Sequence, residues 1–276
     1  EKIWFSELKN LGFIAEDSQN YREEYQSDKL RGELKDYLIN KIADRIDLSN
    51  AEILQFMWYY HNKKYADKYD VVNTLINRWA ISSADSDISS LALQRTAFKM
   101  FKMEDTNILD HFDINAYPRA IDLSKRFNHI FEEFIKAQYD ITQEYFKEKN
   151  IKYLTLYRGL GLTPTETIKV DDFFLQPISS FSTNQTTAES FAKERDGIVL
   201  VSRVPVSRIL SIALTGVGCL PEYEATVLGG KIKALSLDVI AIETTEMDRY
   251  NNIVQDAFNK IAPPEKIKYF QEIPES

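Results

Sequence analysis

The chain has 276 residues, of which 44% are hydrophobic and 28% charged, ordinary values for a globular protein that exclude wholesale disorder. It carries 34 basic and 42 acidic residues, and both halves are acidic, which argues against sequence-independent binding of nucleic acids or anionic membranes. The single cysteine, Cys219, excludes an internal disulfide framework and a cysteine-based zinc site, and the three scattered histidines predict no metal. No apolar run reaches the roughly 18 residues of a membrane span.

Residues 1 to about 150 have a helical pattern. An i, i+4 apolar stripe predicts a helix over 29–48, and Ser49 then starts a capping-box pattern with Glu52 at the head of the next helix. Asp70 is a candidate cap for a third helix.

Two further helices follow in this half of the chain. Ser86 or Asp87 is expected to open the first of them, and Pro118 suits the first turn of a long helix that runs to about Lys149. Residues 1–149 are therefore predicted to form an all-helical lobe.

After Asn150 the pattern changes to short β-rich segments, with a short helix expected at 186–193 and another at 247–261. Short strands with few helices between them favour an antiparallel or mixed sandwich over a doubly wound parallel sheet. The expected strands cover 151–157, 173–178, 198–204, 208–212, 223–228 and 239–244. The predicted fold class is α+β, with the helical lobe followed by a second domain over 150–276.

Three short segments of the second part carry candidate chemistry. Arg158 and Gly159 end a predicted strand, where the arginine suits a phosphate and the glycine lets a planar ligand approach, although a surface ion pair is the simpler interpretation. A Ser/Thr cluster around Ser182 follows another strand, where a serine could orient a catalytic carboxylate, although turn capping is the simpler interpretation. Glu222 and Glu224 are expected to share one face of a strand, as two solvated charges or as a carboxylate pair for cleavage of a glycosidic bond.

Together, in this order, these segments resemble the R-S-E class of mono-ADP-ribosyltransferases, which includes arginine-modifying and actin-modifying bacterial toxins and vertebrate ecto-transferases. The match covers roughly residues 150–245, and the first 150 residues resemble no family known to us. The resemblance implies a split β-sandwich that holds NAD in a cleft. It implies an enzyme that transfers ADP-ribose from NAD to an arginine of a target protein and releases nicotinamide, with NAD as a substrate and no metal.

The resemblance also implies a role for each site residue. Arg158 would hold the NAD phosphates, and Gly159 would offer its backbone to the nicotinamide amide. Ser182 would orient Glu224, which would stabilise the positive charge of the sugar as nicotinamide leaves. Thr183 would support the strand, and Glu222 would help to deprotonate the arginine nucleophile. Tyr157 and Phe181 would pack either around the nicotinamide ring or in the core.

The sequence departs from the family pattern at two places. The third position of the usual Ser-Thr-Ser is Asn184, and the loop over 216–221 lacks the aromatic residue that some toxins use to grip a protein target. Cys219 in this loop is interpreted as incidental rather than nucleophilic. The helical lobe has two open interpretations, a surface that docks the target or a cover for one side of the NAD cleft.

Two alternatives to the transferase stay open at this point. One is an NAD glycohydrolase, and the other is a non-catalytic protein-binding module on a degenerate transferase fold. By resemblance we expect a secreted effector or virulence toxin that acts in the cytosol of a host or target cell, although the first residues, Glu1 to Phe5, lack a signal-peptide h-region.

Overall fold

The computed structural model describes residues 2–14, 28–81, 88–103, 118–160, 173–193, 197–216, 222–232 and 234–239 of the chain. All of them fall in one contact unit, Glu1–Ile240. The helices are α1 (Lys2–Asn10), α3 (Asp28–Ala43), α4 (Asn50–His61), α5 (Lys68–Ile81), α6 (Ile88–Met100), α8 (Pro118–Arg126), α9 (Asn128–Glu148), α10 (Gln185–Lys193) and the short η2 (Val206–Arg208). The strands are β1 (Tyr153–Leu160), β2 (Phe173–Ser182), β3 (Ile198–Pro205), β4 (Ile209–Ile212), β5 (Glu224–Ile232) and β6 (Ala234–Val239). The α+β class is confirmed.

The start of α4 follows the sequence prediction. Ser49 Oγ accepts from the Glu52 N–H, and the Glu52 carboxylate accepts from the Ser49 N–H, so the capping box is complete. The predicted cap of α5 was wrong by three residues, because Asp67 Oδ1 accepts from the Asp70 N–H at 3.0 Å while Asp70 lies in the first turn. The predicted start at Ser86 or Asp87 lies outside the described residues.

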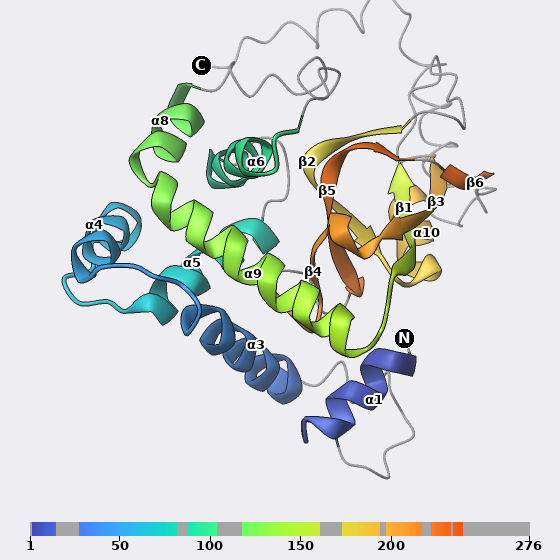
Figure 1. Cartoon of the computed structure of the whole chain (residues 1–276), viewed down its shortest axis with the longest axis horizontal. Coiled ribbons are helices and arrows are strands. Elements are labelled where there is room, and N and C mark those ends of the chain that lie inside the picture. The colour runs from blue at the N-terminus through green and yellow to red at the C-terminus, as the bar shows by residue number, and fades with distance from the viewer. Residues whose placement is uncertain are drawn as a thin grey trace, which may run out of the picture. The chain divides into compact units, whose positions relative to one another are not determined.

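The long helix predicted from Pro118 is two helices, α8 and α9, which break at Phe127. There the backbone departs from helical angles, with φ −116° and ψ 28°. The Phe127 ring is buried and packs edge to face on Phe56 of α4, with ring centres 5.2 Å apart. Figure 1 shows α9 with α3 and α4 on one side and the sheet on the other.

All strand pairs of the sheet are antiparallel, in the order β4-β5-β2-β1-β3-β6. The pairing between β2 and β1 consists of one registered pair, Tyr157 with Ser182, whereas β1 pairs with β3 over eight residues. The sheet is thus two three-stranded halves that meet at one point. Of the strand predicted over 239–244 only Val239, the last residue of β6, is described, and residues 240–244 and the helix predicted over 247–261 lie outside the described residues.

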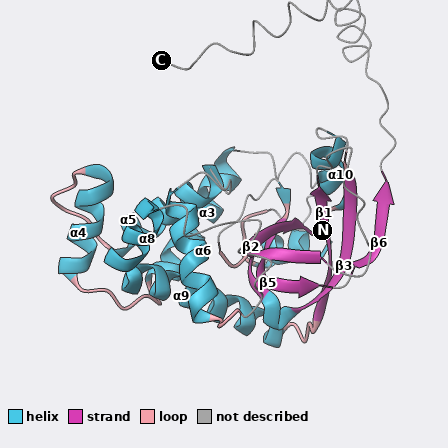
Figure 2. Ribbon diagram, turned by 90° about the horizontal axis from the view of Figure 1, so that it is seen from above, coloured by secondary structure: helices cyan, strands magenta, loops and turns pink. Residues whose placement is uncertain are grey.

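Helices and strands share their hydrophobic cores. One core cluster joins α4, α5, α6 and α9 to Ile178, Leu210 and Leu228 of the sheet, and a second joins Leu34 of α3 and Phe146 of α9 to several strands. Ala188 and Ala192 of α10 pack against Tyr157 of β1 and against β3. Figure 2 shows α10 beside β1 and β3. The predicted boundary at residues 149 and 150 coincides with the change from α9 to β1, but the packing is continuous across it. The division into two functional domains therefore stays a prediction.

Candidate functional site

A pocket opens at the junction of the two half-sheets. The predicted residues that line it are Tyr157, Arg158, Gly159, Phe181, Ser182, Glu222 and Glu224, while Thr183 is not in its wall. The sheet explains this convergence, because Ser182 ends β2 and pairs with Tyr157 of β1 on one side and with Glu224 of β5 on the other. Directly opposite residues of antiparallel strands present their side chains to the same face, so Ser182 and Glu224 are neighbours.

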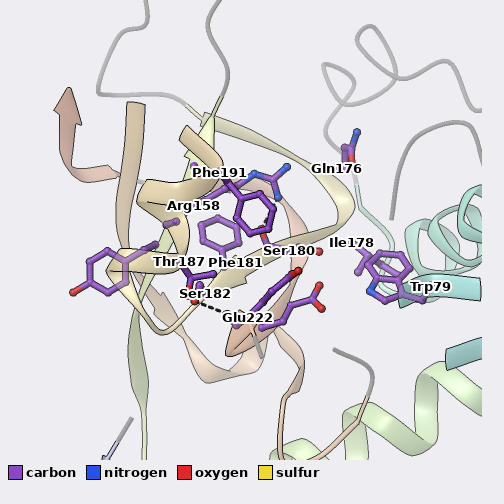
Figure 3. Close-up of a pocket in the computed structure, with 14 residues that line it drawn as sticks. Trp79, Arg158, Gln176, Ile178, Ser180, Phe181, Ser182, Thr187, Phe191 and Glu222 are labelled. Carbon is purple, nitrogen blue, oxygen red and sulfur yellow. Dashed lines mark hydrogen bonds between the residues drawn. The ribbon is translucent and has the colours of Figure 1, made fainter. Parts of the chain in front are cut away.

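Arg158 fastens the two half-sheets together where their pairing is weakest. Its Nη1 donates to the Ser180 carbonyl oxygen at 2.7 Å, which links β1 to β2 through a side chain. The guanidinium carbon also lies 5.7 Å from the centre of the Phe181 ring, within the range of a cation–π contact. Figure 3 shows the guanidinium near Phe191 and Phe181 in the pocket. Arg158 is thus a brace of the site as well as a cation in it.

Ser182 acts on the backbone of the Glu-x-Glu segment. Its hydroxyl donates to the Glu222 carbonyl oxygen at 2.7 Å, the hydrogen bond drawn in Figure 3, and it accepts from the Asn184 N–H at 2.9 Å. A hydroxyl has one proton. Ser182 therefore does not bond the Glu224 carboxylate directly, as the sequence interpretation expected, but holds the turn that leads into Glu224. The same turn is tied by the Thr183 N–H, which donates to the Tyr223 carbonyl oxygen at 3.1 Å.

The two glutamates reach the pocket by a different route from the one predicted. Glu224 is the first residue of β5, but Glu222 precedes the strand, and Tyr223 between them has φ 51°, in the left-handed region. A bulky residue rarely adopts this conformation. Here the buried Tyr223 ring is part of a core cluster and stabilises the turn. The prediction that Glu222 and Glu224 share one face of a strand was therefore wrong, although both residues do line the pocket.

The other predicted residues also have structural roles. Phe181 is 3% exposed and belongs to the core, whereas Tyr157 is half-buried and packs against α10. A Cβ on Gly159 would lie 2.3 Å from the Ala188 carbonyl oxygen, so Gly159 lets α10 approach β1. Cys219 and most of its loop lie outside the described residues.

Several residues of the pocket wall were not predicted from the sequence. Gln176, Ile178 and Ser180 occur at every second position before Ser182 in β2, a signal that strand alternation could have found. Thr187 and Phe191 are one turn apart on α10, and Phe191 is 41% exposed at the pocket. Trp79 of α5 has no such signal, because its position depends on packing between distant segments.

The pocket combines the features of a small-molecule site. Its volume is about 270 Å³, slightly below the roughly 300–1,000 Å³ of typical ligand pockets, so it suits one end of a long ligand. Glu224 is only 6% exposed in a wall that also contains a guanidinium and several aromatic rings. A buried carboxylate interacts more strongly with a nearby positive charge than one in water does. The site can therefore hold a planar, partly cationic group.

Comparisons with protein-family models, with curated proteins and with solved structures found no match to this chain. Within the described segments, no group of three or more His, Cys, Asp or Glu side chains is arranged to ligate a metal ion. None of the helices in the described part of the chain is both long and apolar enough to cross a bilayer.

Proposed function

We propose that the chain is a mono-ADP-ribosyltransferase that transfers ADP-ribose from NAD to an arginine of a protein. The observation that carries the proposal is that one pocket collects Arg158, Ser182 and the two glutamates from three strands and the turn before β5. The division of the sheet into two halves joined at one pair also agrees with a split β-sandwich. The pocket's size and aromatic wall fit the nicotinamide end of NAD.

The proposed reaction breaks the bond between the sugar C1′ and the nicotinamide nitrogen, and the electron pair leaves with nicotinamide. The sugar then becomes oxocarbenium-like, and the Glu224 carboxylate would stabilise its positive charge. An arginine nitrogen of the acceptor forms the new bond to C1′. Its proton would pass to the Glu222 carboxylate, since a guanidinium is a poor nucleophile until it loses a proton.

The other residues would position these groups. Arg158 would hold the NAD phosphates while it braces β1 against β2, and the Gly159 backbone would face the nicotinamide amide. Ser182 would fix the turn between the two glutamates. A toxin or effector role in a target cell follows from the resemblance and is part of the proposal.

The test measures nicotinamide release and label transfer from NAD labelled in its adenylate part. The purified chain is incubated alone, with a small guanidine acceptor such as agmatine, and with cell lysate. Wild type is expected to label the guanidine and a lysate protein. Glu224→Ala is expected to lose both nicotinamide release and transfer, by about 10²-fold or more, whereas Glu222→Gln loses transfer and retains slow hydrolysis of NAD.

The exposed Glu148 at the end of α9 provides a matched control, and Glu148→Gln should behave as wild type. Consumption of NAD without any labelled acceptor would show that the chain is an NAD glycohydrolase and not a transferase. Absence of both activities in wild type would contradict the proposal and favour a binding module.

A further inference from the structure

We propose that Trp79 of the helical part is a ligand-binding residue, whose indole N–H donates a hydrogen bond to a sugar hydroxyl of NAD. The proposal rests on the proposed function, because it names NAD as the ligand. It also chooses between the two interpretations of the helical part, since Trp79 would make α5 one wall of the NAD site.

Trp79 lies at the C-terminal end of α5 and lines the pocket together with Gln176 and Ile178. Figure 3 shows its ring beside Ile178, with the nitrogen on the side of the ring nearer Glu222. The side chain is only 3% exposed. The helical part thus contributes one large aromatic ring with a polar N–H to a wall that is otherwise built from the sheet, the turn before β5 and α10.

The indole nitrogen has no hydrogen-bond acceptor among the described residues, although it is fully covered. A buried donor without an acceptor is unfavourable, and such groups in folded proteins usually have a reason. Packing alone does not supply one, since a phenylalanine would offer an apolar ring without the cost. A ligand that enters the pocket would supply the missing acceptor.

Water in the neighbouring space does not explain the indole either. Behind Trp79 lies a second cavity of about 10 Å³, which Leu93, Phe134 and Leu210 help to line. This volume is at the limit for one water molecule, and only apolar atoms are exposed in it, so a water there would lack partners. Because the N–H is covered, its hydrogen bond to a ligand requires a small tilt of the ring toward the pocket.

The polar groups around Trp79 favour a hydroxyl as the group of the ligand that binds there. The indole N–H only donates, and the carboxylates across the pocket only accept when ionised. A hydroxyl accepts from the first and donates to the second, whereas a carbonyl oxygen can do only the first. The sugar hydroxyls of NAD are groups of this kind.

The experiment removes the N–H and keeps an aromatic ring. Trp79→Phe is expected to raise the KM and Kd of NAD about tenfold, the loss of one neutral hydrogen bond, and to change kcat by less than about twofold. Incorporation of 3-benzothienylalanine at position 79 replaces N–H by sulfur in a ring of nearly the same shape, and should give the same result if the phenylalanine variant folds poorly. Trp58→Phe is the matched control, because Trp58 of α4 is 54% exposed and lies outside the pocket wall.

Affinities for two fragments of NAD show whether Trp79 contacts the ADP-ribose part or the carbonyl oxygen of nicotinamide. The benzothienylalanine variant should bind ADP-ribose about tenfold more weakly and nicotinamide as wild type does. Unchanged Kd and KM of NAD in both Trp79 variants, while wild type still consumes NAD, would overturn the role of Trp79 alone. A wild-type chain that neither binds nor consumes NAD would overturn the proposed function, and the role of Trp79 with it.

Discussion

Replacing Gly159 with alanine tests whether the contact between β1 and α10 holds the pocket in shape. A Cβ at this position would lie 2.3 Å from the Ala188 carbonyl oxygen, 2.7 Å from the Ala192 nitrogen and 2.9 Å from the Phe191 Cβ. Two of these atoms are backbone atoms, so no side-chain rotation relieves the overlap and α10 has to move outward.

Overpacking of this kind costs about 1–3 kcal/mol, and for a chain of this size that lowers the thermal midpoint by roughly 2–10 °C. Because α10 carries Thr187 and Phe191 of the pocket wall, its displacement should also weaken NAD binding. The assays are thermal unfolding followed by circular dichroism and titration with NAD. A further readout, amide exchange in α10, should report faster exchange there than in α9.

Gly32 provides a control with the opposite expected sign. It is exposed on α3, and a Cβ there would meet no atom within 4 Å. Gly32→Ala should therefore stabilise the protein by about 0.5–1 kcal/mol through the better helix propensity of alanine. A Gly159→Ala protein as stable as wild type, with unchanged affinity for NAD, would refute the argument that this glycine sets the spacing of α10.

The remaining predictions concern the ion pair that links α4 to α9 and the serine that holds the Glu-x-Glu turn. Hydrogen bonds from Ser49 and His129 lower the pKa of Glu52 to about 2, and the hydrogen bond to Glu52 raises the pKa of His129. The stabilisation from Glu52 is present above the pKa of about 4.3 that this group has in the unfolded chain, and it is lost as the pH falls toward 2. The stabilisation from His129 is present below its unfolded pKa of about 6.5, and it is lost as the pH rises through the raised pKa of the folded state. His129→Ala should therefore lower the thermal midpoint near pH 5.5 and have little effect near pH 9; an equal loss at both would contradict the linkage. Ser182→Ala should lower both the thermal midpoint and kcat, since it removes the hydrogen bonds that the hydroxyl makes with the Glu222 carbonyl and the Asn184 N–H, at a cost of about 1–3 kcal/mol. Ser190→Ala, on the exposed face of α10, should change neither.

Local patterns predicted those parts of the molecule that depend on neighbouring residues. The capping box at Ser49 needs only four consecutive residues, and it formed as expected. The break at Phe127 depends on a buried aromatic contact with Phe56, about 70 residues away, and the helix periodicity contains no sign of it. The sequence therefore predicted the kinds of elements well and their exact ends less well.

The candidate site shows the same division. Arg158, Ser182 and Glu224 were chosen from three short motifs, and the register of β1, β2 and β5 brings them to one pocket. The conformation of Tyr223 could not be predicted, since residue type disfavours a positive φ there and only tertiary packing of the ring makes it possible. The same dependence on packing hid Trp79.

The weak seam between β1 and β2 explains why a pocket forms at this place at all. A fully paired sheet would bring the backbones of β1 and β2 together along their whole length, but here they meet at Tyr157 and Ser182 alone. Beyond that point the space between the half-sheets is spanned by the Arg158 side chain, which bonds to Ser180 of β2. A ligand that binds Arg158 would therefore act on a polar link across the seam. Binding at this pocket and the cohesion of the two half-sheets are consequently coupled, and loss of Arg158 should affect both.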